Sequence, residues 1–388
     1  MRITLLLLTL LTINLFAQQN YQKIHDRALV ADMHTDVLLR HLKGEDIEHY
    51  SLKGQVDLDR LRKGGVDAVF FAVWPDPRHV PGEQMFDTTM AMIDTLHQIF
   101  RRNDDKILFS DSPLQLQETV DEKKIAAFIG VEGGTAIEND LNKLDELYQR
   151  GARYLGLTWN NSTAWASSAR DEANPAWKGH HGLTAFGREV IRRMNELGMI
   201  IDLSHSGERT FYDVLAASTK PVIASHSSVY AICPHYRNLK DDQIRALAIN
   251  GGVMFINFYP GFLVEGFDGI YRQSRKDADA IEDSLKTAGS DEPFDRAAFI
   301  HSRIDSLYPG VRVIADHIDY VVRLVGDDHV GLGSDFDGIS IPPAGLENVS
   351  KMPAITKELL RRGYSEDSIR KILGGNFERV LGEVRSRK

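Results

Sequence analysis

Short apolar runs alternate with longer segments of mixed polarity along most of this chain. The apolar runs begin after residue 24 and are rich in Val, Ile, Phe and Ala. Most are continuously apolar, which is the pattern of strands covered on both faces of a sheet. The pattern predicts eight strands, at residues 28–33, 67–73, 125–131, 153–158, 199–203, 221–225, 252–258 and 329–333.

The segments between these runs have the spacing of helices. Helices are predicted at residues 83–102, 141–150, 184–197, 208–217 and 241–250, and a Ser-Pro-Leu-Gln sequence at 112–115 has the form of a capping box. Regular alternation of strand and helix predicts a parallel sheet, and eight repeats favour a closed (β/α)8 barrel of the TIM type. The alternative is an open sheet with a Rossmann-like crevice. No G-x-G-x-x-G sequence follows an early strand, which disfavours that alternative.

Residues 261–310 interrupt the alternation after the seventh predicted strand. Acidic residues outnumber basic ones in this segment, and Gly, Ser, Asp and Pro cluster at 289–293. The composition predicts a solvated, largely helical insertion within one barrel domain that spans residues 24–388. Two interpretations stay open. The insertion is either simply exposed, or it serves as a lid or as the surface of a homodimer.

Residues 1–17 have the composition of a secretory signal peptide. Arg2 is followed by an almost wholly apolar run to Phe16, and Ala17 precedes polar residues. The run is too short to span a bilayer comfortably, and the small residue at its end suits a cleavage site. An N-terminal anchor or a buried helix is the alternative. We expect an exported protein, periplasmic or secreted, whose mature form has no membrane anchor.

Composition excludes several classes of function. The 388 residues include 46 basic and 55 acidic side chains, a formal net charge of −9, and no basic run, so nucleic acid is not an expected partner. The single cysteine, Cys233, rules out an intrachain disulfide and a cysteine-rich zinc site. The 14 histidines exceed what a chain of this size needs for packing. This excess directs attention to metal chemistry.

Histidines and carboxylates follow five of the eight predicted strands. They are His34 and Asp36 after the first strand, Glu132 after the third, His205 after the fifth, His226 after the sixth, and Asp335 and Asp337 after the eighth. In a barrel of this type the chemistry gathers at the carboxyl ends of the strands. These side chains are therefore expected to meet at one end of the barrel.

Such a set suits a metal centre. His34 and Asp36 are two residues apart, so in an extended chain both side chains leave on the same face and suit one divalent ion. Two more histidines and a Glu from other strands suit a second ion, or a bridge between two. Taken singly, each residue is explained as well by a turn, a core histidine or a helix cap. Their common position at strand ends favours the metal centre.

The strand ends also contain a series of short motifs in a fixed order. These are His34-Thr-Asp36, Val131-Glu-Gly-Gly134, Asp202-Leu-Ser-His205, Ser225-His-Ser-Ser228, Arg237-Asn238, Val253-Met-Phe-Ile-Asn-Phe-Tyr259, Gly331-Leu-Gly-Ser-Asp-Phe-Asp-Gly338 and Gly374-Gly-Asn-Phe-Glu-Arg-Val-Leu381. Together they resemble the membrane (renal) dipeptidase family of zinc peptidases, in the amidohydrolase superfamily. We expect a bacterial, exported member.

The resemblance implies a metallo-dipeptidase with two zinc ions per chain. His34 and Asp36 would bind one ion, His205 and His226 would bind the other, and Glu132 would bridge both. Hydrolysis would use a hydroxide activated by the two metals. The family's substrates are dipeptides, and a D-residue is tolerated at their C-terminal position.

The resemblance also implies roles beside the metals. Asp335 would accept and deliver protons, and Arg237 would bind the free carboxylate of the dipeptide. Tyr259, at the end of the seventh strand, is a candidate for lining the pocket. Where mammalian members have a substrate-contacting histidine, this chain has Trp159. An indole packs and donates one hydrogen bond but does not ionise, so we expect Trp159 to contact substrate without taking over that role.

Two other functions stay open on the sequence alone. One is another metal hydrolase of the amidohydrolase type, such as a lactonase, deaminase or phosphotriesterase. Many of those enzymes use a lysine, often carbamylated, where this chain has Glu132, which favours a dipeptidase. The other is a non-catalytic exported binding protein, which the complete set of metal-binding and proton-handling residues disfavours.

Overall fold

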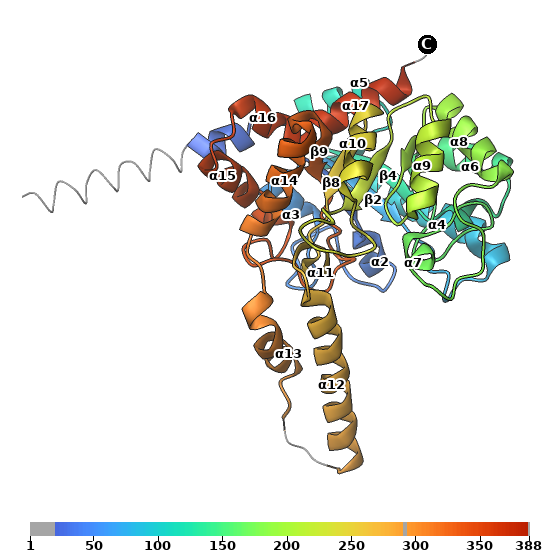
Figure 1. Cartoon of the computed structure of the whole chain (residues 1–388). Coiled ribbons are helices and arrows are strands. Elements are labelled where there is room, and N and C mark those ends of the chain that lie inside the picture. Colours follow the sequence, from blue (N-terminus) through green and yellow to red (C-terminus); the bar gives the residue numbers. More distant parts are fainter. Residues whose placement is uncertain (1–19, 290–292, 387–388) are drawn as a thin grey trace, which may run out of the picture.

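Eight parallel strands form a nearly closed barrel with helices around it (Figure 1). The computed structural model describes residues 20–289 and 293–386, so the predicted signal peptide lies outside the described residues. The barrel strands, in order around the sheet, are β1 (Ala31–Thr35), β2 (Ala68–Val73), β4 (Ile125–Glu132), β5 (Ala152–Gly156), β6 (Ile200–Asp202), β7 (Ile223–Ser227), β8 (Val253–Ile256) and β9 (Val330–Leu332). The predicted barrel is confirmed, and the open-sheet alternative is wrong.

The loop after β9 closes the barrel onto β1. Phe336 forms a parallel bridge with Thr35, and its carbonyl accepts the backbone N–H of Asp36 at 2.8 Å. The backbone N–H of Asp335 donates to the carbonyl of His34 at 3.0 Å. Closure therefore places the carboxyl end of the last strand beside that of the first.

The helices predicted between the strands are present within two residues of their expected ends. From β1 onward the α-helices are α2 (Val37–His41), α3 (Leu58–Lys63), α4 (Met85–Arg102), α5 (Pro113–Asp121), α6 (Leu141–Gln149), α7 (Ala169–Glu172), α8 (Ala185–Leu197), α9 (Glu208–Ala217), α10 (Asp241–Ile249), α11 (Pro260–Leu263), α12 (Phe267–Thr287), α13 (Arg296–Ile304), α14 (Arg312–Val325), α15 (Pro353–Arg361), α16 (Glu366–Arg370) and α17 (Asn376–Arg385). Ser112 caps α5 by accepting the N–H of Gln115, as the capping box predicts.

The strands lie within about two residues of their predicted bounds, except in two places. The first strand begins at Ala31 rather than at residue 28, and a short extra strand, β3 (Ile107–Phe109), pairs with the first residues of β4. Three residues are too few to stand out as an apolar run, so the hydrophobic pattern does not reveal β3.

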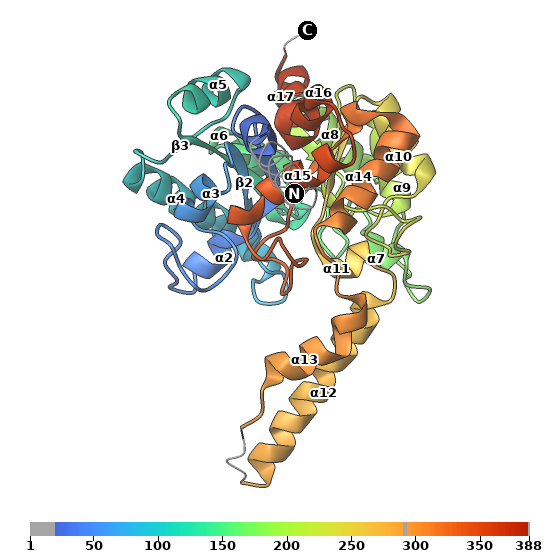
Figure 2. The ribbon, with the colours of Figure 1, turned by 90° about the vertical axis from the view of Figure 1, so that its left-hand side faces the viewer.

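Alternate residues of the strands fill the inside of the barrel with apolar side chains. Among them, Phe70 of β2 and Phe128 of β4 both pack edge-on against Phe377 of α17, with ring centroids 5.5 and 5.3 Å away. Helix α17 lies at the end of the barrel opposite α2 and α11 (Figures 1 and 2). One end of the barrel is thus closed by an apolar core, and the carboxyl ends of the strands carry the polar residues.

Helices α12 and α13 form an arm that projects from the carboxyl-end side of the barrel (Figures 1 and 2). Its base is apolar, with Phe267 and Ile304 buried. Farther out, Arg296 lies 2.7 Å from Asp279 and 3.0 Å from Glu282, so ion pairs join the two helices. A role of this insertion as a lid or homodimer surface stays a prediction. Among the described helices, none has the length and apolarity needed to cross a membrane.

Candidate metal centre

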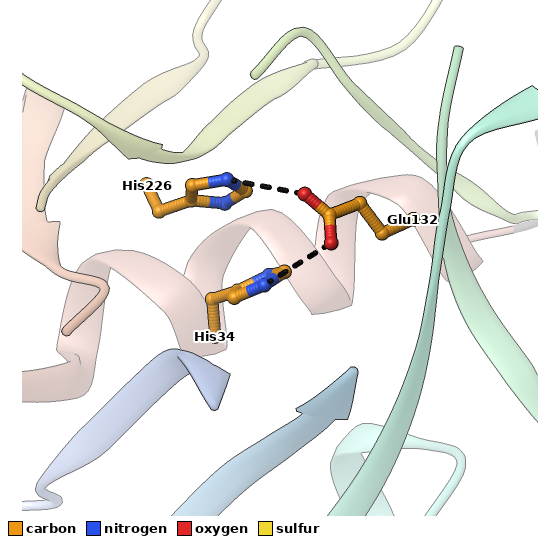
Figure 3. Close-up of side chains that lie close together, drawn as sticks. All are labelled: His34, Glu132 and His226. Carbon is orange, nitrogen blue, oxygen red and sulfur yellow. Dashed lines mark ion pairs between the residues drawn. The ribbon is translucent and has the colours of Figure 1, made fainter. Parts of the chain in front are cut away.

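Glu132 lies at the centre of a group of histidines at the carboxyl ends of the strands (Figure 3). It is the last residue of β4, on the face of the strand that points into the barrel. Its Oε1 is 3.0 Å from Nε2 of His205 and 3.6 Å from Nε2 of His226. Its Oε2 is 3.7 Å from Nε2 of His34. The two oxygens of one carboxylate therefore face histidines from different strands.

Asp36 and Asp335 lie on the His34 side of this group. Asp36 Oδ2 is 3.5 Å from His34 Nε2, and His34, Asp36 and Asp335 each offer one ligand atom within 4.8 Å of the others. His34, Glu132 and His226 form a second such group. The two groups share His34, so the structure brings the predicted ligands into one cluster.

Irregular backbone aims several of these side chains into the barrel. The pairing register shifts between Asp32 and Thr35 in β1, around His34, and the bulge there redirects the alternation of side chains. A second shift, between Ala224 and Ser227 in β7, surrounds His226. His205 and Asp335 have positive φ angles of 65° and 62°, in the left-handed region that non-glycine residues seldom adopt. Such strain typically gathers at functional sites.

The cluster fits a cation. His34 Nε2 and Asp36 Oδ1 are buried and have no hydrogen-bond partner among the described residues. Burial raises the pKa of Glu132 to about 8, and burial, together with the nearby charge of Asp36, raises the pKa of Asp335 to about 7. Carboxyl groups gathered away from water need positive charge nearby to stay ionised. Nitrogen and carboxylate donors of this kind are the ligands that zinc takes.

The histidines fit the same interpretation. Burial lowers the pKa of His205 and of His226 well below the usual value, so both are neutral and keep a lone pair for a metal. Burial also acts to lower the pKa of His34, but the nearby carboxylates of Asp36 and Glu132 outweigh it and raise that pKa to about 10. The carboxylates therefore favour positive charge at His34 Nε2, and a metal ion bound there would supply that charge in place of the proton.

Each of these histidines has a partner for its second ring nitrogen. Tyr154 Oη lies 2.8 Å from His34 Nδ1, Asn160 Oδ1 lies 3.2 Å from His205 Nδ1, and Ser225 Oγ lies 2.8 Å from His226 Nδ1. Such partners orient metal-binding histidines and fix which nitrogen carries the proton. Sequence reasoning did not assign these three roles. Only Ser225 has a signal, because it precedes His226 within a motif.

The Ser225 contact fixes the tautomer of His226. Ser225 Oγ donates to Asp202 Oδ2 at 2.7 Å, so the same oxygen accepts the N–H of His226 Nδ1. The Nε2 of His226, which faces Glu132, is left with its lone pair. Asp202 also accepts the backbone N–H of Ser225 at 2.8 Å, which holds the end of β7 against β6.

Replacing Ser225 by Ala should therefore weaken metal binding, tested with zinc, by about 10–100-fold, the usual cost of losing an outer-shell partner. Competition with a chromogenic chelator measures this affinity. Ser227→Ala is the matched control, because Ser227 Oγ is buried with no hydrogen-bond partner among the described residues. If both variants bind zinc as tightly as the unaltered chain, Ser225 does not orient His226.

The predicted substrate-binding residues line a common cavity of about 400 Å³. Arg237 is buried, and its Nη2 donates to the carbonyl of His226 at 3.2 Å. Its Nε and Nη1 have no partner within the described part of the chain. Trp159 also lines the cavity, where its ring lies beside that of Trp74. Tyr259 also lines it, but its hydroxyl donates to Asp268 of the arm at 2.9 Å, so its ring rather than its hydroxyl faces a ligand.

Comparison with known proteins agrees with this site. The model of the family "Membrane dipeptidase (Peptidase family M19)" matches residues 18–388. The chain is 34% identical over 344 residues to dipeptidase aclJ of Aspergillus oryzae, covering 87% of this chain and 72% of that protein.

Solved structures of similar proteins share the fold. The probable dipeptidase PvdM of Pseudomonas aeruginosa is 26% identical, with a TM-score of 0.78 and coverage of 95% of this chain and 98% of that one. A metallopeptidase of Rhodobacter sphaeroides, liganded with a phosphinate mimic of the dipeptide L-Ala-D-Ala, is 26% identical, with a TM-score of 0.76 and coverage of 92% and 99%. The chain belongs to the membrane dipeptidase family, peptidase family M19, and is a metallo-dipeptidase, a hydrolase that acts on peptide bonds.

Proposed function

We propose that this dipeptidase uses two zinc ions and hydrolyses dipeptides that have a free C-terminal carboxylate. The observation that carries the proposal is the position of Glu132, whose two oxygens face His34 on one side and His205 and His226 on the other. His34 and Asp36 would hold one ion, His205 and His226 would hold the second, and Glu132 would bridge them. Zinc ions bound there polarise a carbonyl group and lower the pKa of water.

Asp335 moves the proton in this proposal. Its carboxylate lies beside His34 and Asp36, and one of its oxygens accepts a hydrogen bond from Asn257 Nδ2 at 2.9 Å. That bond holds the carboxylate in one orientation and leaves its other oxygen for the attacking water. Asp335 takes the proton of this water and returns it to the nitrogen of the departing amino acid, acting first as general base and then as general acid.

Arg237 determines the length of the substrate. The two guanidinium nitrogens without a partner, Nε and Nη1, favour an anionic ligand, and a guanidinium matches the planar geometry of a carboxylate. A dipeptide held there by its C-terminal carboxylate places its only peptide bond at the metal cluster. The neighbour liganded with a mimic of L-Ala-D-Ala supports acceptance of a D-residue at that end.

The free carboxylate is therefore expected to be essential. For the zinc-loaded enzyme, kcat/KM should be at least about tenfold lower for the C-terminal amide of L-Ala-D-Ala than for the dipeptide itself, because hydrogen bonds to charged groups are lost. In Arg237→Gln the two substrates should become similar. Equal kcat/KM values for the dipeptide and its amide in the unaltered enzyme would show that Arg237 does not bind the C-terminal carboxylate. Failure to hydrolyse any L-L or L-D dipeptide would reject the proposed function itself.

Localisation and assembly are proposed from the sequence pattern. We infer from residues 1–17 that the chain is exported, to the periplasm or the medium. A homodimer formed through the 261–310 insertion, one of the interpretations that the sequence leaves open, stays a prediction.

A further inference from the structure

A wall of two tryptophans and an arginine bounds one part of the active-site cavity. Trp74, Arg78 and Trp159 all line the cavity, together with the metal-cluster residues. The indole rings of Trp74 and Trp159 have centroids 4.7 Å apart. The guanidinium carbon of Arg78 lies 5.6 Å from the Trp74 ring and 5.3 Å from the Trp159 ring. The ring of Trp159 in turn lies 6.3 Å from that of His205.

Asp76 holds the arginine of this wall in place. Its carboxylate accepts three hydrogen bonds from Arg78. The donors are Nε at 2.8 Å, Nη2 at 2.7 Å and the backbone N–H at 2.9 Å. Arg78 is otherwise a largely exposed side chain, 64% accessible to solvent. The ion pair neutralises its charge and fixes it against the indoles. The wall therefore presents flat, apolar aromatic surface to the cavity, supported by a rigid ion pair.

The strand order places Trp74 and Arg78 of this wall opposite the carboxylate-binding residue. Trp74 directly follows β2, and Arg237 belongs to the loop after β7. Around the closed barrel, β2 and β7 are separated by four steps in either direction, so the two strands face each other. A dipeptide bound by Arg237 at its C-terminal end, with its peptide bond at the metal cluster, directs its N-terminal residue toward the wall.

We propose that Trp74, Arg78 and Trp159 bind the side chain of the N-terminal residue and select large apolar side chains, aromatic ones above all. This inference rests on the proposed function. An aromatic side chain offers a flat ring that stacks on the indoles and removes their apolar surface from water. An N-terminal glycine has no side chain, so the indole surface stays exposed to water. Asp76 is a positioning residue, because it acts on the substrate only through Arg78.

The test compares kcat/KM for L-Phe-Gly, L-Leu-Gly, Gly-Gly and Gly-L-Phe, with zinc content and thermal melting measured on every protein. C-terminal glycine makes the result independent of the preference for D- or L-residues at that end. We expect L-Phe-Gly to exceed Gly-Gly by at least about tenfold, within the range by which apolar pockets discriminate. Trp74→Ala and Trp159→Ala should reduce this ratio to about threefold or less.

Asp76→Asn supplies a milder second variant. Releasing Arg78 should raise KM for L-Phe-Gly while changing its kcat little, because the binding surface is loosened and the metal cluster is not touched. Trp177→Ala is the matched control, since Trp177 does not line the cavity, and it should keep the original ratio.

Two results would overturn the proposal. One is an equal kcat/KM for L-Phe-Gly and Gly-Gly in the unaltered enzyme. The other is a preference for Gly-L-Phe that disappears in Trp74→Ala, which would assign the wall to the C-terminal side chain. If no dipeptide is hydrolysed by zinc-loaded protein, the proposed function fails first, and the wall proposal falls with it.

Discussion

Replacing Glu132 by Gln should strip the enzyme of at least one metal ion and of most of its activity. A neutral amide has one oxygen acceptor in place of a charged carboxylate, and it cannot balance two cations. Losing an outer-shell partner alone costs about 10–100-fold in metal affinity or activity, so loss of a ligand shared by both ions should exceed about 100-fold. Elemental analysis of dialysed protein, together with kcat for L-Ala-D-Ala, measures both effects.

The geometry makes this variant informative. Glu132 lies within 4 Å of histidines at the ends of three other strands, and among the described residues no other carboxylate lies that close to all three. Glu138→Gln is the matched control. Glu138 lies six residues farther along the chain, where it accepts the N–H of Phe86 at 2.9 Å and pairs with Lys143, away from the cavity. Glu138→Gln should retain two zinc ions and normal turnover. Two zinc ions and full turnover in Glu132→Gln would show that Glu132 does not bridge.

The meeting of the strand ends on one face could be predicted, because it depends only on the pattern of apolar and polar residues along the chain. Continuous apolar runs give parallel strands, and parallel strands in a barrel end on one face. His34, Glu132 and Asp335 therefore meet although they are far apart in sequence. The family resemblance adds the pairing of ligands with ions, which no spacing rule provides. The structure then shows Glu132 between the histidines, the position that a bridging ligand requires.

Contacts across the barrel could not be predicted in this way. The register shifts around His34 and His226 depend on how neighbouring strands pair. No residue type in β1 or β7 indicates them in the sequence. Tyr154 has the pattern of an interior core residue, yet its hydroxyl reaches His34. Gly130 makes room for it, since a Cβ there would lie 2.0 Å from the Tyr154 ring.

The aromatic wall shows the same limit for the substrate side of the site. Trp159 attracts attention in the sequence because it departs from the family. Trp74 and Arg78 do not, because the segment after β2 belongs to none of the motifs that carry the family resemblance. Only the fold brings these three residues and Arg237 to one cavity. The metal-binding residues can thus be recognised from sequence motifs. Selection of the substrate's side chains depends on loops, whose positions in the fold cannot be predicted from the spacing of residues in the sequence.

Asp335→Asn should leave the zinc content intact while kcat falls steeply. Asn has nearly the shape of Asp and can still pair with Asn257, but it cannot accept the proton of the attacking water. General acid–base assistance is worth about 10²–10⁴-fold, so the fall in kcat should lie at least in that range. KM should change less, because the lost interaction belongs to the transition state.

Asp337→Asn separates this role from a structural one. Asp337 shares the left-handed backbone conformation of Asp335, with φ of 68°. Its carboxylate is used in the fold, where it accepts the backbone N–H of Gln55 at 2.6 Å and pairs with Arg40 at 3.1 Å. Its replacement should lower the free energy of unfolding by roughly 1–3 kcal/mol, as expected for a weakened buried charged pair, with turnover kept. If Asp335→Asn behaves in that way, with near-normal kcat and a lowered melting temperature, Asp335 supports the loop after β9 and does not transfer the proton.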